Sequence, residues 1–154
     1  MYHYTESGLG NVWLHNGFTA HKTPYGDGIA IDNLPSLHRS LSLALALKPA
    51  TLSGAEIRFM RKELELSQPE FAACLGTTTQ TLAAWEEGRA ALPDAADKMI
   101  RVLINAHYRR GCVRRSHRGW RALARTTNKA LHFREAQSGL YYIYVVDSSN
   151  FHLP

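Results

Sequence analysis

Four arginines near the end of the chain have the spacing of a single stripe along a helix. They are Arg114, Arg118, Arg121 and Arg125. Successive members are three or four residues apart, so in a helix they would lie on the same side. Guanidinium groups in such a row can bind phosphates through charge and hydrogen bonds. We expect these four side chains to contact the backbone of a nucleic acid; the alternative is a basic face that contacts only solvent.

Positive charge is concentrated in the same part of the chain. The 154 residues carry 18 Lys and Arg against 13 Asp and Glu, a net charge of +5. Residues 107–154 hold nine basic and two acidic side chains, whereas residues 1–106 hold nine basic and eleven acidic ones. This asymmetry favours a polyanionic partner, above all nucleic acid.

The Cys and His residues of the chain are not spaced as in a metal-binding motif. Cys74 and Cys112 are too few for a disulfide framework or a Cys-based zinc site, and Cys74 is expected in the core between apolar neighbours. The histidines have no HExxH spacing. A metal around His3, His15 and His21 is therefore a minor alternative, and we predict neither a metal nor another cofactor.

Features of an enzyme or a membrane protein are missing from the sequence. We find no paired carboxylates, nucleophile motif or phosphate loop, so we do not expect an enzyme. The enzymatic alternative is a nuclease. Its basic hairpin would carry His117, Arg118, His132 and Tyr144. There is no run of 18 apolar residues and no signal-peptide pattern at the start, so we expect a cytoplasmic protein without a membrane span.

Residues 51–106 have the pattern of a helical domain. Ser53, with Glu three residues later, predicts a helix that begins with a capping box. Ser67 predicts a second, short helix, which Gly76 ends. A third helix is predicted over residues 77–87 and a fourth after Pro93-Asp94. The buried face of this fourth helix is expected to hold Ala96, Met99, Ile100, Leu103 and Ala106 or His107.

The second and third of these helices have the spacing of a helix-turn-helix. Ala72 is small where the two helices must approach closely, and Gly76 follows in the turn. Leu82 and Trp85 are apolar where the second helix of the motif must pack on the others. Together these positions indicate a DNA-binding motif.

The run over residues 52–93 resembles the XRE family of lambda-repressor/Cro-like helix-turn-helix domains. The specific matches are SQxxFAxxLGTTxQT and the ending WEEGR, and the helix at 94–106 extends the resemblance. The resemblance implies a five-helix DNA-binding domain in a transcriptional regulator.

The resemblance also implies roles for single residues. The helix over 77–87 would enter the DNA major groove, where Gln80 could bind adenine N6 and N7 and a Thr methyl could contact a thymine methyl. Arg61 and Glu86 would form a partly buried structural ion pair. The implied DNA contacts are Gln68, Thr78, Thr79, Gln80, Ala84 and Arg89.

The flanking regions complete an expected α+β fold. Residues 1–50 predict two or three short strands, with turns at 16–17 and 25–28, and a helix at 34–47. We expect a small subdomain there for dimerisation or partner binding. Residues 107–154 predict a basic segment, helical over 113–127, and a β-hairpin. Its strands are expected at Leu131–Ala136 and Leu140–Val146.

These observations predict a sequence-specific DNA-binding regulator, an autorepressor that binds a pseudo-palindromic operator as a homodimer. Either the N-terminal subdomain or the hairpin would supply the dimer contact. The alternative is an antitoxin-type protein that neutralises a partner toxin and binds DNA for autoregulation, because the N-terminal region resembles extensions of such regulators. The zinc-binding members carry paired CxxC motifs there, whereas no cysteine precedes Cys74 in this chain.

Overall fold

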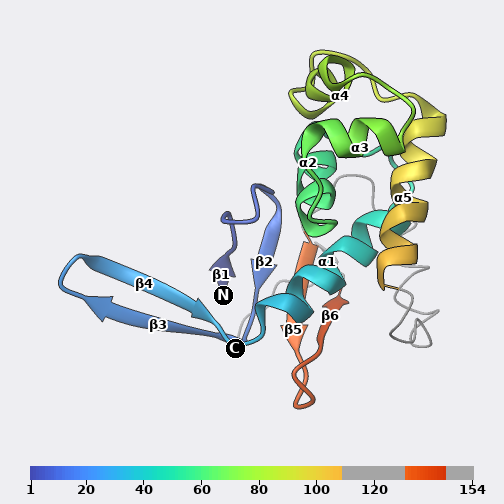
Figure 1. The fold of residues 1–154 in the computed structure, drawn as a ribbon. Coiled ribbons are helices and arrows are strands. Elements are labelled where there is room, and N and C mark those ends of the chain that lie inside the picture. The colour runs from blue at the N-terminus through green and yellow to red at the C-terminus, as the bar shows by residue number, and fades with distance from the viewer. Residues whose placement is uncertain (109–130, 145–154) are drawn as a thin grey trace.

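The computed structural model describes residues 1–108 and 131–144 and has a mixed α+β fold (Figure 1). The strands are β1 (Tyr2–His3), β2 (Val12–Leu14), β3 (Phe18–Thr23), β4 (Gly26–Ile31), β5 (Leu131–Glu135) and β6 (Tyr141–Tyr144). The helices are α1 (Leu34–Leu47), α2 (Gly54–Glu63), α3 (Gln68–Cys74), α4 (Thr79–Glu86) and α5 (Asp94–Tyr108). Helices α2 to α5 lie in the range predicted for the DNA-binding domain, so this range holds four helices where the resemblance implied five; α1 precedes it.

Strands from both ends of the chain form one four-stranded sheet. Its order is β1-β2-β5-β6; β2 and β5 run parallel, and the other neighbours are antiparallel. Val12, Leu14 and Phe133 are fully buried on one side of this sheet. The hairpin predicted near the C-terminus is therefore present, but it joins the N-terminal strands, an arrangement that the sequence analysis did not predict.

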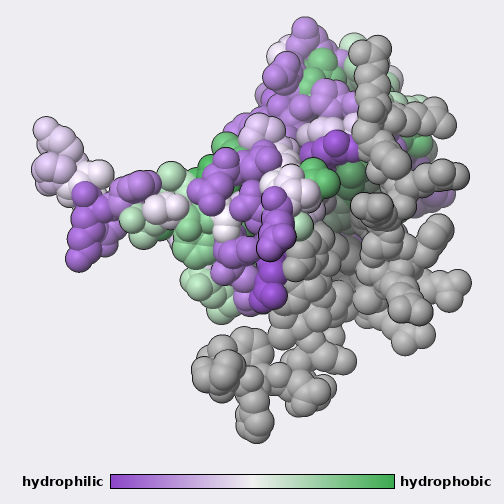
Figure 2. All heavy atoms as spheres, turned by 90° about the horizontal axis from the view of Figure 1, so that it is seen from below, coloured by the Kyte–Doolittle hydropathy of each residue, from purple (hydrophilic) through white to green (hydrophobic). Residues whose placement is uncertain are grey.

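Strands β3 and β4 form a separate antiparallel ribbon that projects from the body (Figures 1 and 2). Most of its residues are exposed, and Tyr25 at the tip is 99% exposed. The N-terminal region thus has four strands where two or three were predicted. The turn of the ribbon lies at Pro24-Tyr25, slightly before the predicted position.

The core is one cluster shared by the sheet and all five helices. Its largest fully buried members are Val12, Leu14, Leu37, Leu41, Leu45, Ile57, Met60, Phe71, Leu82, Ile100, Ile104 and Phe133. Helix α1 lies between the sheet and the other helices, since it contacts β6 on one side and α2 and α5 on the other. The two ends of the chain and its helical middle are therefore packed together.

Two predictions about burial are wrong. Cys74 at the end of α3 is exposed, because the turn that follows leaves the last residue of this short helix at the surface. On α5, Met99 is 45% exposed, and Ala106 and His107 are also exposed. The buried stripe of α5 lies instead at Ala96, Asp97, Ile100 and Ile104. It contains Asp97 because this carboxylate accepts hydrogen bonds from the Leu52 amide and from Arg101.

Candidate nucleic-acid interface

Helices α3 and α4 are short and joined by a tight turn at one end of the molecule (Figure 1). Ser67 caps α3, and its capping box with the Glu three residues later is complete. Gly76 has a φ of 65°, a left-handed conformation that suits glycine, and the Thr77 N–H donates to the Ala72 carbonyl at 2.9 Å. Thr78 then caps α4 through its side chain. Local hydrogen bonding thus ends one helix and starts the next within four residues.

Helix α4 is attached to the body through its buried side. Leu82 is fully buried and Trp85 is 7% exposed. Ala72 on α3 is 1% exposed. At the far end of α4, the backbone lies so close to Gly54 that a Cβ there would be 2.4 Å from the Glu86 carbonyl oxygen. This packing fixes α4 against α2 and α3, and within residues 1–108 and 131–144 the first turn of the opposite side stays exposed.

The free side of α4 presents unbonded polar groups near its N-terminus. Thr79 and Gln80 are exposed, and neither side chain hydrogen bonds to any described part of the chain. The Thr78 hydroxyl differs, because it accepts from the Thr81 N–H at 3.2 Å and lies 2.9 Å from the Thr81 hydroxyl. Ala84, one turn after Gln80, is half-buried and offers only its methyl group. The amide of Gln80 and the hydroxyl of Thr79 are therefore available to a ligand.

A buried ion pair lies behind this surface. The Arg61 Nε lies 2.6 Å from Glu86 Oε1, and its Nη2 donates to Oε2 at 3.2 Å. The Glu86 side chain is fully buried, and the Gln68 amide donates to the same carboxylate at 3.0 Å. Arg61 also donates to the Leu66 carbonyl at 3.0 Å. The network ties α2 and the start of α3 to the end of α4, so Gln68 holds α4 in place.

The charge of Glu86 is stabilised by these contacts. Burial alone would raise the pKa of the Glu86 carboxyl, but the hydrogen bonds from Arg61 and Gln68 and the charges of Arg61 and Arg58 outweigh it. The pKa is therefore lowered, and the pair is ionised at neutral pH. Arg58 lies at the edge of this network, 3.7 Å from Glu86, with its side chain 46% exposed. Arg58 is a cation beside α4 that was not predicted from the sequence.

Lys62 at the end of α2 is exposed and has no ion pair with the described residues, but three other cations of the helical region are paired. Arg89, beyond the end of α4, lies 2.5 Å from the Glu87 carboxylate, and both side chains are exposed. Lys98 pairs with Asp94 one turn earlier on α5. Arg101 pairs with Asp97 and also donates to the Leu45, Ala46, Lys48 and Ala50 carbonyls. The described part of the helical region therefore offers little free positive charge, and the four arginines of the predicted stripe lie outside the described residues.

A second polar network joins the N-terminal region to the helices. The Tyr4 hydroxyl lies 2.7 Å from His38 Nε2, and His38 Nδ1 lies 2.7 Å from Glu63. The Tyr108 hydroxyl donates to the same carboxylate at 3.0 Å. Burial would raise the pKa of Glu63, but these partners outweigh it and the pKa is lowered. Burial raises the pKa of both tyrosines to about 12, so both hydroxyls stay protonated at neutral pH.

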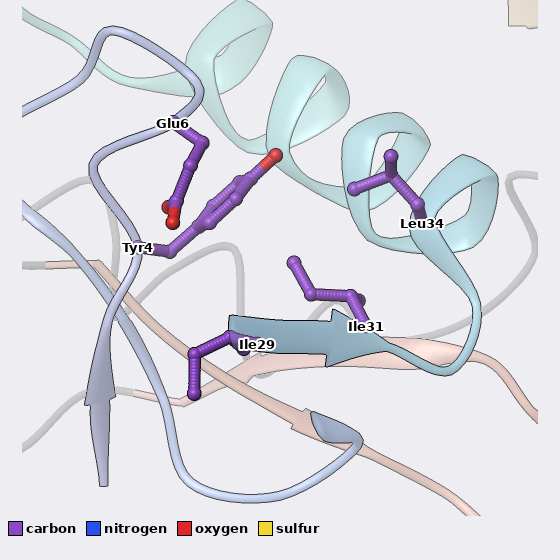
Figure 3. Close-up of a pocket in the computed structure, with 5 residues that line it drawn as sticks. All are labelled: Tyr4, Glu6, Ile29, Ile31 and Leu34. Carbon is purple, nitrogen blue, oxygen red and sulfur yellow. The ribbon is translucent and has the colours of Figure 1, made fainter. Parts of the chain in front are cut away.

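A small pocket lies at the base of the β3–β4 ribbon (Figure 3). Its volume is about 210 Å³, and its walls are Tyr4, Glu6, Ile29, Ile31 and Leu34. The polar groups of this wall have partners, because the Tyr4 hydroxyl bonds to His38 and the Glu6 carboxylate accepts from Tyr2. The pocket is therefore lined by apolar side chains and by polar groups that already have hydrogen-bond partners. This lining does not indicate a particular ligand.

The three histidines considered as a metal site lie apart. His3 stacks on Trp13, and His21 is on the exposed strand β3. His15 Nε2 lies 3.0 Å from Nδ1 of His132, and burial lowers the pKa of both rings. In the described ranges, no three His, Cys, Asp or Glu side chains come together as metal ligands would.

Within residues 1–108 and 131–144, no helix combines the length and the apolar character needed to cross a membrane. Comparison of the chain with protein-family models, curated proteins and solved structures gives no significant match.

Proposed function

We propose that the protein is a sequence-specific DNA-binding regulator whose α3 and α4 form a helix-turn-helix of the lambda-repressor-like type. The main support for this proposal comes from the first residues of α4. Thr79 and Gln80 are exposed and unbonded at the start of α4, while the other side of that helix is fixed by buried packing. The N-terminal residues of a recognition helix are those that contact base edges in the major groove.

The rigid support behind α4 favours this function. Base readout is favoured when the helix that carries the reading side chains is already held in place, because ordering that helix on binding would cost conformational entropy. The Arg61–Glu86–Gln68 network and the close approach at Gly54 hold α4 from behind. The Thr78 cap fixes its first turn. These contacts make α4 a suitable platform for reading bases.

Binding to phosphates needs charge from elsewhere in the chain. Arg89 and Arg58 lie near the C-terminal end of α4, but each is close to a carboxylate. We therefore assign most phosphate binding to the arginine stripe at 114–125, which counterion release would make dependent on salt. Replacing all four arginines by Ala should flatten the plot of log K against log salt concentration, and an unchanged slope would reject this assignment.

A homodimer on a pseudo-palindromic operator is part of the proposal. Its two recognition helices would lie about 34 Å apart, one turn of DNA. The Tyr141 backbone at the edge of β6 already bonds to the Ser36 and Ser40 side chains of α1. Of the two proposed dimer surfaces, we favour the N-terminal subdomain, because most residues of its β3–β4 ribbon are exposed.

Footprinting on the DNA upstream of the protein's own gene tests this function. We expect protection of an inverted repeat by the full chain, and loss of protection in the Gln80→Ala variant. No protection even at low salt would contradict autorepression.

The ribbon supports a second candidate function. Strands β3 and β4 pair only with each other within the described residues, and their outer edges could accept a strand of another protein. An antitoxin-type protein would bind its toxin in this way and use DNA binding for autoregulation. Co-purification with a small protein encoded next to its gene would support this candidate, and a pure homodimer from the native host would count against it.

A further inference from the structure

We infer that two copies of the chain pair through their β3–β4 ribbons, and that Tyr25 at the tip of each ribbon inserts into the pocket at the base of the other. The pairing rests on the proposed function only in that a homodimer is expected there. It adds the surface that pairs, the residue that enters the second copy and the place that receives it. None of its evidence comes from α4.

The outer part of the ribbon lacks packing on either face within the described residues (Figures 1 and 2). Phe18 and Ile31 at its base pack on the core of the body, whereas Ala20 and Ile29, farther out, are exposed. An isolated two-stranded ribbon is only marginally stable in water unless one of its faces packs against another element. A partner that covers the outer part would supply this packing.

The two faces of the ribbon differ in character. Phe18 lies opposite Ile31 and Ala20 lies opposite Ile29, and alternate residues of a strand share a face. These four residues therefore form one side, which we call the apolar face. The other side carries small and polar residues, namely Thr19, His21, Thr23, Gly26, Gly28 and Ala30. Because apolar burial drives most protein association, the partner is expected on the apolar face.

The ribbon carries both halves of a self-complementary contact. Tyr25 at its tip is 99% exposed. At its base, Ile29, Ile31 and Leu34 line the pocket, and Leu34 is 40% exposed (Figure 3). Six residues of extended chain, about 20 Å, separate Tyr25 from Ile31. When two such ribbons lie antiparallel, each tip reaches the base of the other, so one two-fold axis satisfies both contacts.

The chemistry of the tip matches that of the pocket. A tyrosine ring has apolar faces and one polar end, and the pocket of about 210 Å³ has apolar walls beside the Glu6 carboxylate. Glu6 is exposed and accepts from the Tyr2 hydroxyl. A carboxylate can accept further hydrogen bonds, so Tyr25 of the second copy can donate to it.

Charge at the tip and at the base is also complementary. Lys22 lies across from Asp27 near the tip, on the side of the apolar face, and forms no ion pair with any described residue. Insertion of Tyr25 would bring this ammonium group toward Glu6 of the second copy. With one Lys and one Asp at the same level, the outer part of the ribbon also does not repel its own copy.

The first measurement is the dimer dissociation constant of the full-length chain by sedimentation equilibrium. Tyr25→Ala removes the ring at the tip, and Tyr25→Phe keeps it. Ala20→Lys places a charge on the apolar face, and its matched control, Ala30→Lys, places the same charge on the other face; both alanines are exposed. Thermal unfolding followed by circular dichroism verifies that each variant folds.

We expect a wild-type dimer whose dissociation constant rises by about 30-fold or more in Tyr25→Ala and in Ala20→Lys, as for an anchoring residue of an interface. Tyr25→Phe should recover most of the affinity, and Ala30→Lys should behave as the wild type. A wild type that stays monomeric, a dimer that Tyr25→Ala leaves unchanged, or equal effects of the two lysines would overturn the pairing.

Thiol cross-linking tests where the tip inserts. Both native cysteines are replaced by Ser, and a chain with Pro24→Cys at the tip is mixed with a chain with Leu34→Cys in the pocket wall. A short bismaleimide should join these two chains, whereas a mixture of Pro24→Cys with Ala30→Cys should give little product. Absence of the first cross-link would place the tip outside the pocket and overturn the insertion.

DNA binding is measured separately, so that the two proposals can fail independently. The wild type selects a duplex from a random pool, the enriched site, and affinity is measured for this site and for one half of it. Tyr25→Ala should bind the half-site as the wild type does, because α4 is unchanged, and should lose affinity for the whole site. Failure of the wild type to bind any duplex at low salt would overturn the proposed function, while a dimer sensitive to Tyr25→Ala would still support the ribbon pairing.

Discussion

Replacing Arg61 by Met tests the packing that holds α4. The variant removes two hydrogen bonds to the Glu86 carboxylate, at 2.6 and 3.2 Å, and one to the Leu66 carbonyl. Glu86 keeps the Gln68 amide but remains fully buried. Breaking such a pair from one side costs about 3–5 kcal/mol, because the remaining charge stays in a poorly solvated position. Arg58, 3.7 Å away, offsets part of the loss, so we expect about 3 kcal/mol.

The assay is urea unfolding followed by far-UV circular dichroism, which reports the helices. The control is Arg89→Met, which removes an exposed pair with Glu87 and should cost less than about 1 kcal/mol. A second variant, Glu86→Gln, allows a double-mutant cycle with Arg61→Met that isolates the interaction of the two side chains.

The pH dependence provides a further test of the same variant. In the wild type the pKa of Glu86 is lowered from 4.5, so its contribution to stability is complete above 4.5 and is lost as pH falls through the lowered value. Without Arg61, burial remains the largest influence on Glu86 and should raise the pKa of its carboxyl. As pH falls, protonation of Glu86 would then remove the buried charge and reduce the destabilisation of the variant. We expect the stability difference to shrink from about pH 7 to about pH 4. A difference below about 1 kcal/mol at neutral pH, or one that stays constant with pH, would refute the reasoning.

Three further perturbations test other features of the fold. Gly54→Ala should destabilise the protein by about 1–3 kcal/mol in urea unfolding, because the new Cβ would lie 2.4 Å from a backbone oxygen of α4, whereas Gly10→Ala, with no atom within 4 Å, should have little effect. Burial lowers the pKa of the His132 ring, so folding favours its neutral form and stability should fall as pH drops below about 6.5; His132→Gln should reduce that fall, and an identical pH profile would contradict this. Thr78→Ala should cost about 1 kcal/mol through loss of the α4 cap, while Thr78→Ser should preserve stability; equal losses would show that the cap is not responsible.

The helices were predictable because their signals are local. Ser53 and Ser67 each have a Glu three residues later, and both capping boxes are present. The predicted helix at 34–47 has the observed bounds, and α4 lies within the predicted range of 77–87. Arg61 and Glu86 were expected to pair from a resemblance, and the structure places them in contact.

Other features depend on contacts between distant segments and could not be read from sequence. The parallel pairing of β2 with β5 joins residues more than 100 positions apart, and each strand has only a few residues. Position 54 requires glycine because the backbone of α4, which is distant in sequence, lies too close to leave room for a Cβ. The exposure of Met99 follows from how α5 packs on α1 and α2. A short apolar pattern does not determine which face of such a helix is buried.

Under the proposed function, Thr79 and Gln80 at the start of α4 read DNA bases. The most direct measurement compares binding of the wild type and a Thr79→Ala/Gln80→Ala variant to an enriched site and to unrelated DNA of the same length, by fluorescence anisotropy. Both side chains are exposed and unbonded in the described structure, so folding should be preserved. We predict a loss of about 10- to 1000-fold on the enriched site and little change on unrelated DNA. Equal affinity of both proteins for the enriched site would contradict the claim.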